Sequence, residues 1–418
     1  MQELLAGYGE SNITPEMGLE LSGYGYHLSR KATGVLDDIK IRAVYLTDGE
    51  EVLLLMSCDL LGFSLEYADD LRQSIADDLG IPARSIAAAC THTHAAPVVQ
   101  NLMGLGEPSP EYIKQVHSKA REAARRAAED AAPAKACFAQ QMIEPIGYNR
   151  RNGNFKEIDP MLSEVVLVRK QGNICLLNYA CHAVTLGATD KITADWPGAV
   201  VRAMEHSGQK AIIFQGFCGD VNPTARLYMA SGQQYENLAL YGSLICDRAM
   251  RLAKIAEPLE ARLSSAEERI NLPLSIPSED ELEKFKEGLK TVDCTKGIGR
   301  FQSWWVETAL KNLPKYKCNP YLENVPIHGM KIGSLNLLAL PGEVFSQMGV
   351  GLRKTYPQLF TLGYCNGNAG YIPTKAAYGK TEDYACYDAP KFYSIFPFTP
   401  QVYDIMEAAG RRVLGRIA

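Results

Sequence analysis

The stretch Ser85–His94, which reads Ser-Ile-Ala-Ala-Ala-Cys-Thr-His-Thr-His, joins an apolar run of strand length to a pair of histidines. Side chains alternate faces along a strand, so His92 and His94, two residues apart, are predicted to project from the same side of the strand's end. Two imidazoles that face one point are typical of a metal site. The pattern therefore indicates hydrolytic chemistry at the edge of a sheet.

Apolar runs of strand length recur along the chain and alternate with helical patterns. This alternation predicts an α/β fold with a mixed β-sheet core flanked by helices. Strands are predicted at 39–46, 51–58, 85–90, 164–168, 173–180, 211–217, 334–340 and 360–365. Helices are predicted at 65–79, 110–131, 196–206, 235–256, 343–356 and 400–416. A capping box at Ser278–Glu281 opens a segment of about 275–320 that reads as a helical insertion or a lid.

Composition and charge exclude several classes of function. The net charge of −5, with no cluster of basic residues, argues against a nucleic-acid partner and against an anionic membrane surface. No run of about 18 apolar residues and no secretion signal is evident, so a cytoplasmic protein without stable membrane association is expected. The eleven cysteines form no CxxC pair, which favours reduced thiols. The oligomeric state stays open.

Further polar residues follow other apolar runs. His182 comes after the strand at 173–180, and Asp220 and Asn222 lie in a glycine-and-proline turn after the strand at 211–217. Glu343 stands at a predicted strand-to-helix junction, and Tyr371 follows the strand at 360–365. Structural roles are the alternatives. His182 could be a hydrogen-bonded core histidine, and Asp220 could form an Asx-turn or N-cap. Glu343 could complement a helix dipole, and Tyr371 could be a packed tyrosine.

Two or three imidazoles and a carboxylate form an open zinc site, in which the ion activates water and polarises a carbonyl oxygen. These are the needs of amide or ester cleavage. A local HxH motif also occurs in metallo-β-lactamase-like and barrel amidohydrolase sites. The aspartate expected soon after the second histidine of the former is missing, because Ala95, Ala96 and Pro97 follow here. The sequence has neither GxGxxG nor a Walker P-loop, so a nucleotide cofactor has no support.

Taken in order, the motifs resemble the catalytic domain of the neutral/alkaline non-lysosomal ceramidases. The matching blocks run through nearly the whole chain, at 34–43, 91–97, 195–198, 219–223, 340–343 and 369–374. The resemblance implies one catalytic domain over residues 1–418, in a short form without the family's C-terminal immunoglobulin-like domain.

The resemblance also implies the roles of individual residues. Zinc is expected to bind His92, His182, Glu343 and Tyr371. The scissile group or its oxyanion is expected to contact His94, Arg150 and Tyr384. Asp220 and Asn222 are catalytic candidates because they lie in the block that reads Gly-Asp-Val-Ser-Pro in the family. Asn222 replaces its serine, which leaves a water-based mechanism intact and excludes a serine-based one.

The function expected from these residues is zinc-dependent hydrolysis of an amide bond by metal-activated water. The expected substrate is a small soluble N-acyl compound rather than membrane ceramide, since a soluble protein has poor access to a bilayer lipid. Two alternatives remain: a metal-dependent esterase or lactonase, and a non-catalytic homologue that binds a metal or a ligand.

Overall fold

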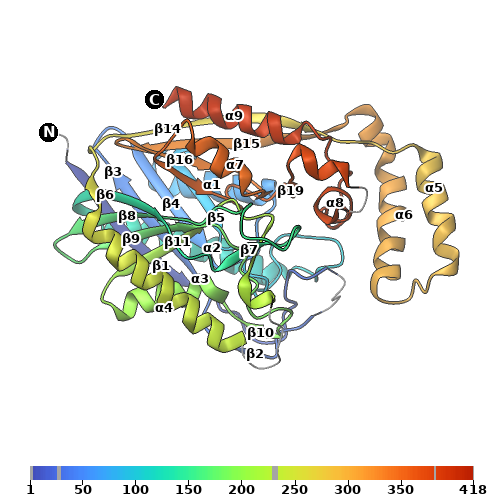
Figure 1. Cartoon of the computed structure of the whole chain (residues 1–418), viewed down its shortest axis with the longest axis horizontal. Helices are drawn as coiled ribbons and strands as arrows, with labels where there is room; N and C mark the ends of the chain where they lie inside the picture. The colour runs from blue at the N-terminus through green and yellow to red at the C-terminus, as the bar shows by residue number, and fades with distance from the viewer. Residues whose placement is uncertain (1–2, 26–29, 228–233, 381–382, 418) are drawn as a thin grey trace.

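The computed structural model describes residues 3–25, 30–227, 234–380 and 383–417, whose elements stack in four layers (Figure 1). Two β-sheets face each other across an apolar core, and helices cover their outer faces. The predicted α/β fold with a mixed sheet is confirmed. No helix among the described residues combines the length and the apolarity that a membrane span needs.

The larger sheet has nine strands among the described residues. Strands β4 and β5 are parallel, as are β9 and β11, and the other neighbours are antiparallel. Its order is β11 (Lys210–Gln215), β9 (Ile174–Tyr179), β8 (Met161–Arg169), β6 (Ala132–Met142), β1 (Leu4–Asn12), β3 (Lys40–Thr47), β4 (Val52–Cys58) and β5 (Ile86–Cys90), with β13 (Glu257–Pro258) beside β6.

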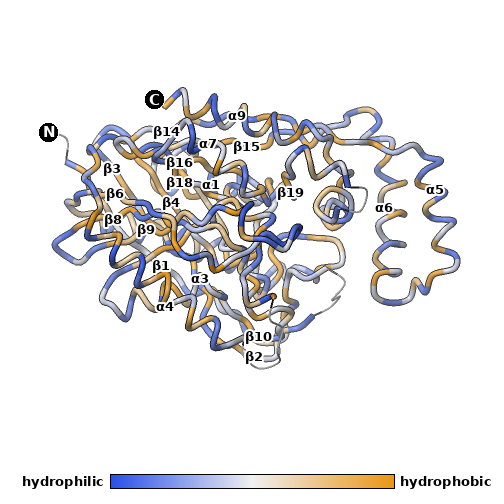
Figure 2. The backbone as a smooth tube through the Cα atoms, in the orientation of Figure 1, coloured by the Kyte–Doolittle hydropathy of each residue, from blue (hydrophilic) through white to orange (hydrophobic). Residues whose placement is uncertain are grey.

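The smaller sheet has the order β14 (Leu263–Pro273), β15 (Tyr321–Ile332), β16 (Leu335–Ala339) and β18 (Leu359–Leu362). Its inner face packs on the larger sheet through residues such as Met330, Leu337 and Phe360. Strands β4 and β9 of the larger sheet are mostly hydrophobic along their length, as Figure 2 shows. This is expected where both faces of a sheet are covered.

The helices are divided between the two outer faces. The larger sheet is covered by α1 (Leu65–Leu79), α2 (Pro110–Glu129), α3 (Asp195–His206) and α4 (Gln234–Leu252). The smaller sheet is covered by α7 (Gln347–Arg353) and α9 (Val402–Arg416). The hairpin of α5 (Glu279–Gly288) and α6 (Gly297–Cys318) extends past the sheets, next to the short helix α8 (Ala389–Phe392) (Figure 1).

All eight predicted strands are present, with shifted ends. The long strands β1, β6, β14 and β15 were not predicted. In β1, Gly7 and Gly9 break the apolar pattern, yet both are needed because α2 lies directly against them: a Cβ on Gly7 would stand 2.0 Å from the carbonyl oxygen of Ala127. Strand β14 is mostly half-buried and carries charged residues, so its alternation is weak.

The predicted helix at 343–356 begins too early. Residues Glu343–Val344 form strand β17, which pairs in parallel with β19 (Tyr371–Ile372), and helix α7 begins only at Gln347. A long-range strand pairing therefore overrides the local helical pattern. As a consequence, complementation of a helix dipole does not explain Glu343.

Side-chain hydrogen bonds draw the two edges of the larger sheet together. Ser57 Oγ on β4 donates to the carbonyl oxygen of Ile213 on β11 at 2.6 Å, and Gln215 Nε2 donates to the carbonyl oxygen of Thr91 at 2.9 Å. The smaller sheet joins them, since the amide of Gly363 donates to Gln215 O at 2.9 Å. The carboxyl ends of β5, β9, β11, β16 and β18 consequently meet in one region.

Candidate metal centre

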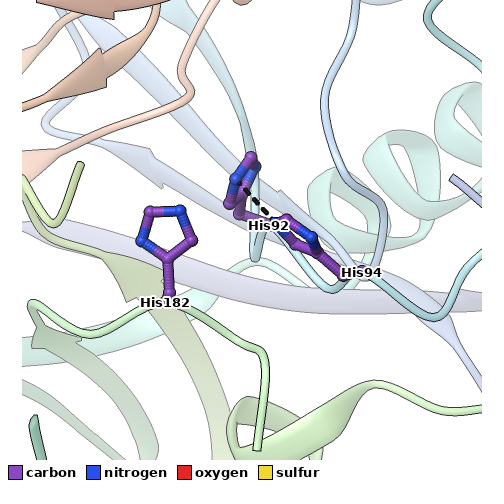
Figure 3. Close-up of side chains that lie close together, drawn as sticks. All are labelled: His92, His94 and His182. Carbon is purple, nitrogen blue, oxygen red and sulfur yellow. Dashed lines mark hydrogen bonds between the residues drawn. The ribbon is translucent and has the colours of Figure 1, made fainter. Parts of the chain in front are cut away.

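Three histidines lie together at this meeting point, on the segments that follow β5 and β9 (Figure 3). Candidate ligand atoms of His92, His94 and His182 all lie within 4.8 Å of one another. His92 Nε2 and His94 Nε2 are 3.2 Å apart. The structure thus brings together the HxH pair and the third histidine that the sequence placed after separate strands.

The two histidines of the HxH pair converge by a different geometry from the predicted one. Strand β5 ends at Cys90, and His92 has a φ of +60°, in the left-handed region. The chain therefore turns at His92 instead of continuing as a strand. An isolated parallel bridge between Thr93 and Ala183 then holds the segment beside the one that carries His182.

Backbone carbonyls fix two of the rings. His92 Nδ1 lies 2.7 Å from the carbonyl oxygen of Leu61, and His182 Nδ1 lies 2.7 Å from that of Cys218. A carbonyl oxygen only accepts, so each Nδ1 must carry the proton and donate it. The Nε2 atoms of both rings are left facing the cluster, the arrangement typical of ligating histidines. Burial, with Arg150 nearby, lowers the pKa of His182 to about 4, which keeps this ring neutral.

Glu343 adds a carboxylate from strand β17. Its Oε2 is 3.1 Å from His182 Nε2 and 3.4 Å from His92 Nε2, and its side chain is buried. Oε1 accepts a hydrogen bond of 2.7 Å from the hydroxyl of Tyr393.

Tyr371 and Arg150 stand beside this carboxylate. The pairing of β17 with β19 places Tyr371 directly opposite Glu343. Arg150 Nη2 donates to the Tyr371 hydroxyl at 2.6 Å and to the carbonyl oxygen of Gly219 at 2.7 Å. Burial disfavours the charge of Arg150, yet Tyr371 and Glu343 more than compensate and raise its pKa.

His94 differs from the other two histidines in its surroundings. Its ring packs edge-on against Tyr24, with 5.0 Å between ring centroids. Its Nδ1 is buried and has no hydrogen-bond partner among the described residues. Gly23 lies so close that a Cβ there would stand 2.5 Å from this nitrogen. Burial and the neighbouring His92 lower the pKa of His94 well below its usual value, so the ring is neutral.

Asp220 and Asn222 occupy different positions relative to the cluster. Asp220 Oδ1 accepts from the amide of Ser346 at 2.8 Å, and Oδ2 accepts from Asn149 Nδ2 at 3.0 Å. Its backbone oxygen accepts from the amide of Arg150 at 2.9 Å. Asp220 thus ties the Arg150 turn to the start of α7. Asn222 lies on β12 (Val221–Pro223), paired with β7 (Gly147–Asn149), and borders a cavity.

This cavity, of about 760 Å³, is bordered by Arg150, and none of the proposed metal ligands is among its described lining residues. Tyr384 also lines it, and its ring packs edge-on against Tyr371 with 5.9 Å between centroids. The other lining side chains include Tyr148, Arg151, Phe345, Lys380 and Asp383. Arg150, Asn222 and Tyr384 therefore line the same cavity. Arg150 and Tyr384 also contact Tyr371, one of the residues proposed as metal ligands.

Sequence reasoning missed the residues that support the ligands. Tyr364 stacks on His92, with 3.9 Å between ring centroids and 14° between planes. Trp196 Nε1 donates to the carbonyl oxygen of His182 at 3.1 Å, and Asp195 Oδ1 accepts from the amide of Thr185 at 3.1 Å. The Asp195-Trp196 motif signalled a functional segment. Tyr364 and Tyr393 carried no sequence signal, because each acts through distant partners.

Comparisons with known proteins place the fold. No family model matches the chain, and no curated protein sequence matches it. The fold is similar to that of the crystal structure of neutral ceramidase from Pseudomonas aeruginosa, with a TM-score of 0.76 and 18% identity over 99% of this chain and 74% of that chain. A structure of a ceramidase complexed with C2 gives a TM-score of 0.77 and 16% identity over 100% and 75% of the two chains.

The described chain therefore shares the fold of the neutral ceramidases over about three quarters of their length. This confirms the fold that the resemblance of the motifs implied. At such low identities the likeness extends to the fold, and the chemistry has to be argued from the site itself.

Proposed function

We propose that this protein is a zinc-dependent hydrolase that cleaves an amide bond of a small soluble N-acyl compound. The observation that carries the proposal is the convergence of His92, His182 and Glu343, with His94 alongside, on one buried point. The fold shared with neutral ceramidases supports the same reaction class.

The donor set fits a cation. The proton of His182 is on Nδ1, so the bare Nε2 faces an ionised carboxylate oxygen at 3.1 Å. Two electron-pair donors at this distance repel each other unless a positive charge lies between them. His92 Nε2, whose proton is likewise on Nδ1, points into the same space. Nitrogen and carboxylate oxygen are ligands that zinc prefers.

In this proposal His92, His182 and Glu343 hold the ion. Tyr371 is the proposed fourth ligand, since its register opposite Glu343 brings the phenol to the same side. His94 Nε2 also lies within ligand distance of the cluster, so the geometry allows it either to bind the ion or to face the substrate. Tyr393 orients Glu343 through the hydrogen bond to Oε1.

A zinc ion in such a site supplies a Lewis acid for the carbonyl and a source of nucleophilic water near neutral pH. Tyr384, on the cavity wall, is the proposed donor to the scissile carbonyl as it gains negative charge, and Arg150 is proposed to contact the substrate beside the scissile group. Preorganised donors of this kind are worth about 10²–10³ in rate each. Asp220 holds the Arg150 turn in place and is assigned a positioning role. Asn222 contributes an amide to the cavity and no nucleophile.

The cavity supports a soluble substrate. Its volume of about 760 Å³ and its charged lining suit a compact polar molecule better than a long lipid chain. Since activated water attacks ester and amide carbonyls alike, a metal-dependent esterase or lactonase remains the alternative reaction. Matched amide, ester and lactone substrates compared by kcat/KM separate the two.

The proposal is tested by metal content and activity together. The purified protein is expected to hold about one zinc per chain, measured by elemental mass spectrometry. The double variant His92→Ala with His182→Ala is expected to lose the zinc and the hydrolase activity, because two of the ligands are gone. His206→Ala, on the exposed end of α3, is the matched control and should retain both.

Two outcomes contradict the proposal. Stoichiometric zinc in the double variant refutes the assigned site. Zinc bound in the wild-type protein without turnover of any amide, ester or lactone shows a metal-binding protein without hydrolase activity.

A further inference from the structure

The cavity beside the candidate metal centre has an excess of positive charge among its described lining residues. Arg150, Arg151 and Lys380 line it, with Asp383 as their acidic counterpart. Asp383 forms an ion pair with Arg151, whose Nε and Nη2 lie 2.8 Å and 2.7 Å from Asp383 Oδ2. Arg150 and Lys380 form no ion pair with any described acidic residue.

Arg150 is the unusual member of this group. Its guanidinium is buried beside the cluster, and its protein acceptors are a carbonyl oxygen and a phenol oxygen, both reached by Nη2 alone. A guanidinium carries five N–H donors in a fixed fork that matches a carboxylate. Its Nε and Nη1 donors have no protein acceptor among the described residues, and Arg150 borders the cavity. These open donors beside the cavity suit a ligand anion, because a carboxylate accepts two parallel hydrogen bonds from a guanidinium.

We propose that this cavity binds an anionic group of the substrate, and that the substrates are N-acyl amino acids. The carboxylate sits two bonds from the amide nitrogen, so it reaches the open edge of Arg150 while the scissile carbonyl lies at the metal centre. Lys380, exposed at the rim of the cavity, adds a second positive charge that attracts the anion.

The reaction class rests on the function proposed above. In the overall hydrolysis, the oxygen of water forms a bond to the acyl carbon, and the carbon–nitrogen bond breaks. The amine takes up a proton, so a free amino acid and a carboxylate are released. No oxidant, reductant or further co-reactant is required.

A matched pair of probes tests the charge preference: N-hexanoylglycine and its neutral counterpart N-hexanoylglycinamide. Binding is measured by calorimetry and hydrolysis by amine release, both with the zinc-loaded protein. The carboxylate is expected to bind at least about tenfold more tightly than the carboxamide, as charged hydrogen bonds provide. Lys380→Gln is expected to weaken binding of the carboxylate probe by about threefold to tenfold and to affect the carboxamide probe less, so that the preference for the carboxylate falls.

Lys170→Gln, an exposed lysine in the turn between β8 and β9, is the control and should change neither probe. Equal binding of the two probes overturns the anion subsite. A double variant, Lys380→Gln with Arg150→Gln, that still prefers the carboxylate over the carboxamide to the same extent also overturns it. Selective binding of the carboxylate without hydrolysis refutes the proposed function and leaves the anion subsite standing. Hydrolysis of both probes at the same rate supports the proposed function and refutes the anion subsite.

Discussion

Glu164 is a carboxylic acid inside the larger sheet, far from water. It lies on β8 between β6 and β9, opposite Ala139 and Leu177, and its side chain is fully buried. Neither carboxyl oxygen has a hydrogen-bond partner at normal distance. Burial raises the pKa of Glu164 from 4.5 to about 8, and the neighbouring Cys175 thiol offsets a small part. The folded protein therefore keeps a proton that the unfolded chain releases.

This proton makes the stability of the protein depend on pH. The contribution of Glu164 is constant below about pH 4.5, falls as the pH rises towards 8, and is constant again above it. A rise in pKa from 4.5 to about 8 corresponds to a loss of about 5 kcal/mol in the free energy of unfolding, at about 1.4 kcal/mol per unit. At pH 7 the loss is about 3 kcal/mol.

Glu164→Gln removes the ionisation and keeps the shape. The variant is expected to match the wild-type stability at pH 4.5 and to exceed it by about 3 kcal/mol at pH 7. Urea unfolding from pH 4.5 to 9 measures the difference. Glu129→Gln, at an exposed glutamate on α2, is the control and should stay within about 0.5 kcal/mol throughout. A stability difference for Glu164→Gln that does not change with pH refutes the reasoning.

Three further perturbations test the supports of the fold and the site. Tyr393→Phe deletes the donor to Glu343 and should weaken zinc affinity by about 10- to 100-fold in a chelator competition, and unchanged affinity contradicts this role. Trp196→Phe removes the donor to the carbonyl oxygen of His182, so zinc affinity should fall while chemical denaturation changes by less than about 2 kcal/mol. Arg42→Met strands the buried Asp59 and should cost about 3–5 kcal/mol in chemical denaturation, and a loss below about 1 kcal/mol would show that the pair is dispensable.

Much of the candidate site follows from local sequence. His92, His94 and His182 each follow an apolar strand, and the structure brings them within ligand distance. The local reasoning about HxH was nevertheless wrong in its geometry, because the chain turns at His92 instead of extending. Glu343 was predicted at the start of a helix and lies instead in a strand paired with Tyr371. The roles of all these residues stay predictions until metal and activity are measured.

The hairpin of α5 and α6 was also predicted only in part from the local sequence. The capping box at Ser278–Glu281 predicted the start of a helix, and both of its reciprocal hydrogen bonds are formed. Where the hairpin packs was not predictable. Phe301 on α6 stacks on Phe392 of α8 with 4.4 Å between ring centroids, next to the tyrosine that binds Glu343. Whether the segment of about 275–320 acts as a lid stays a prediction.

The sequence by itself determined the α/β class, the positions of the apolar strands and the residue types that end them, because periodicity and capping depend on neighbours within a few residues. Only the tertiary structure decided which strand ends meet. Hydrogen bonds such as that from Ser57 to Ile213, between residues far apart in the chain, draw the edges of the larger sheet together. Tyr364 and Tyr393 join the site for the same reason, since packing and hydrogen bonding between distant segments leave no periodic trace in the sequence.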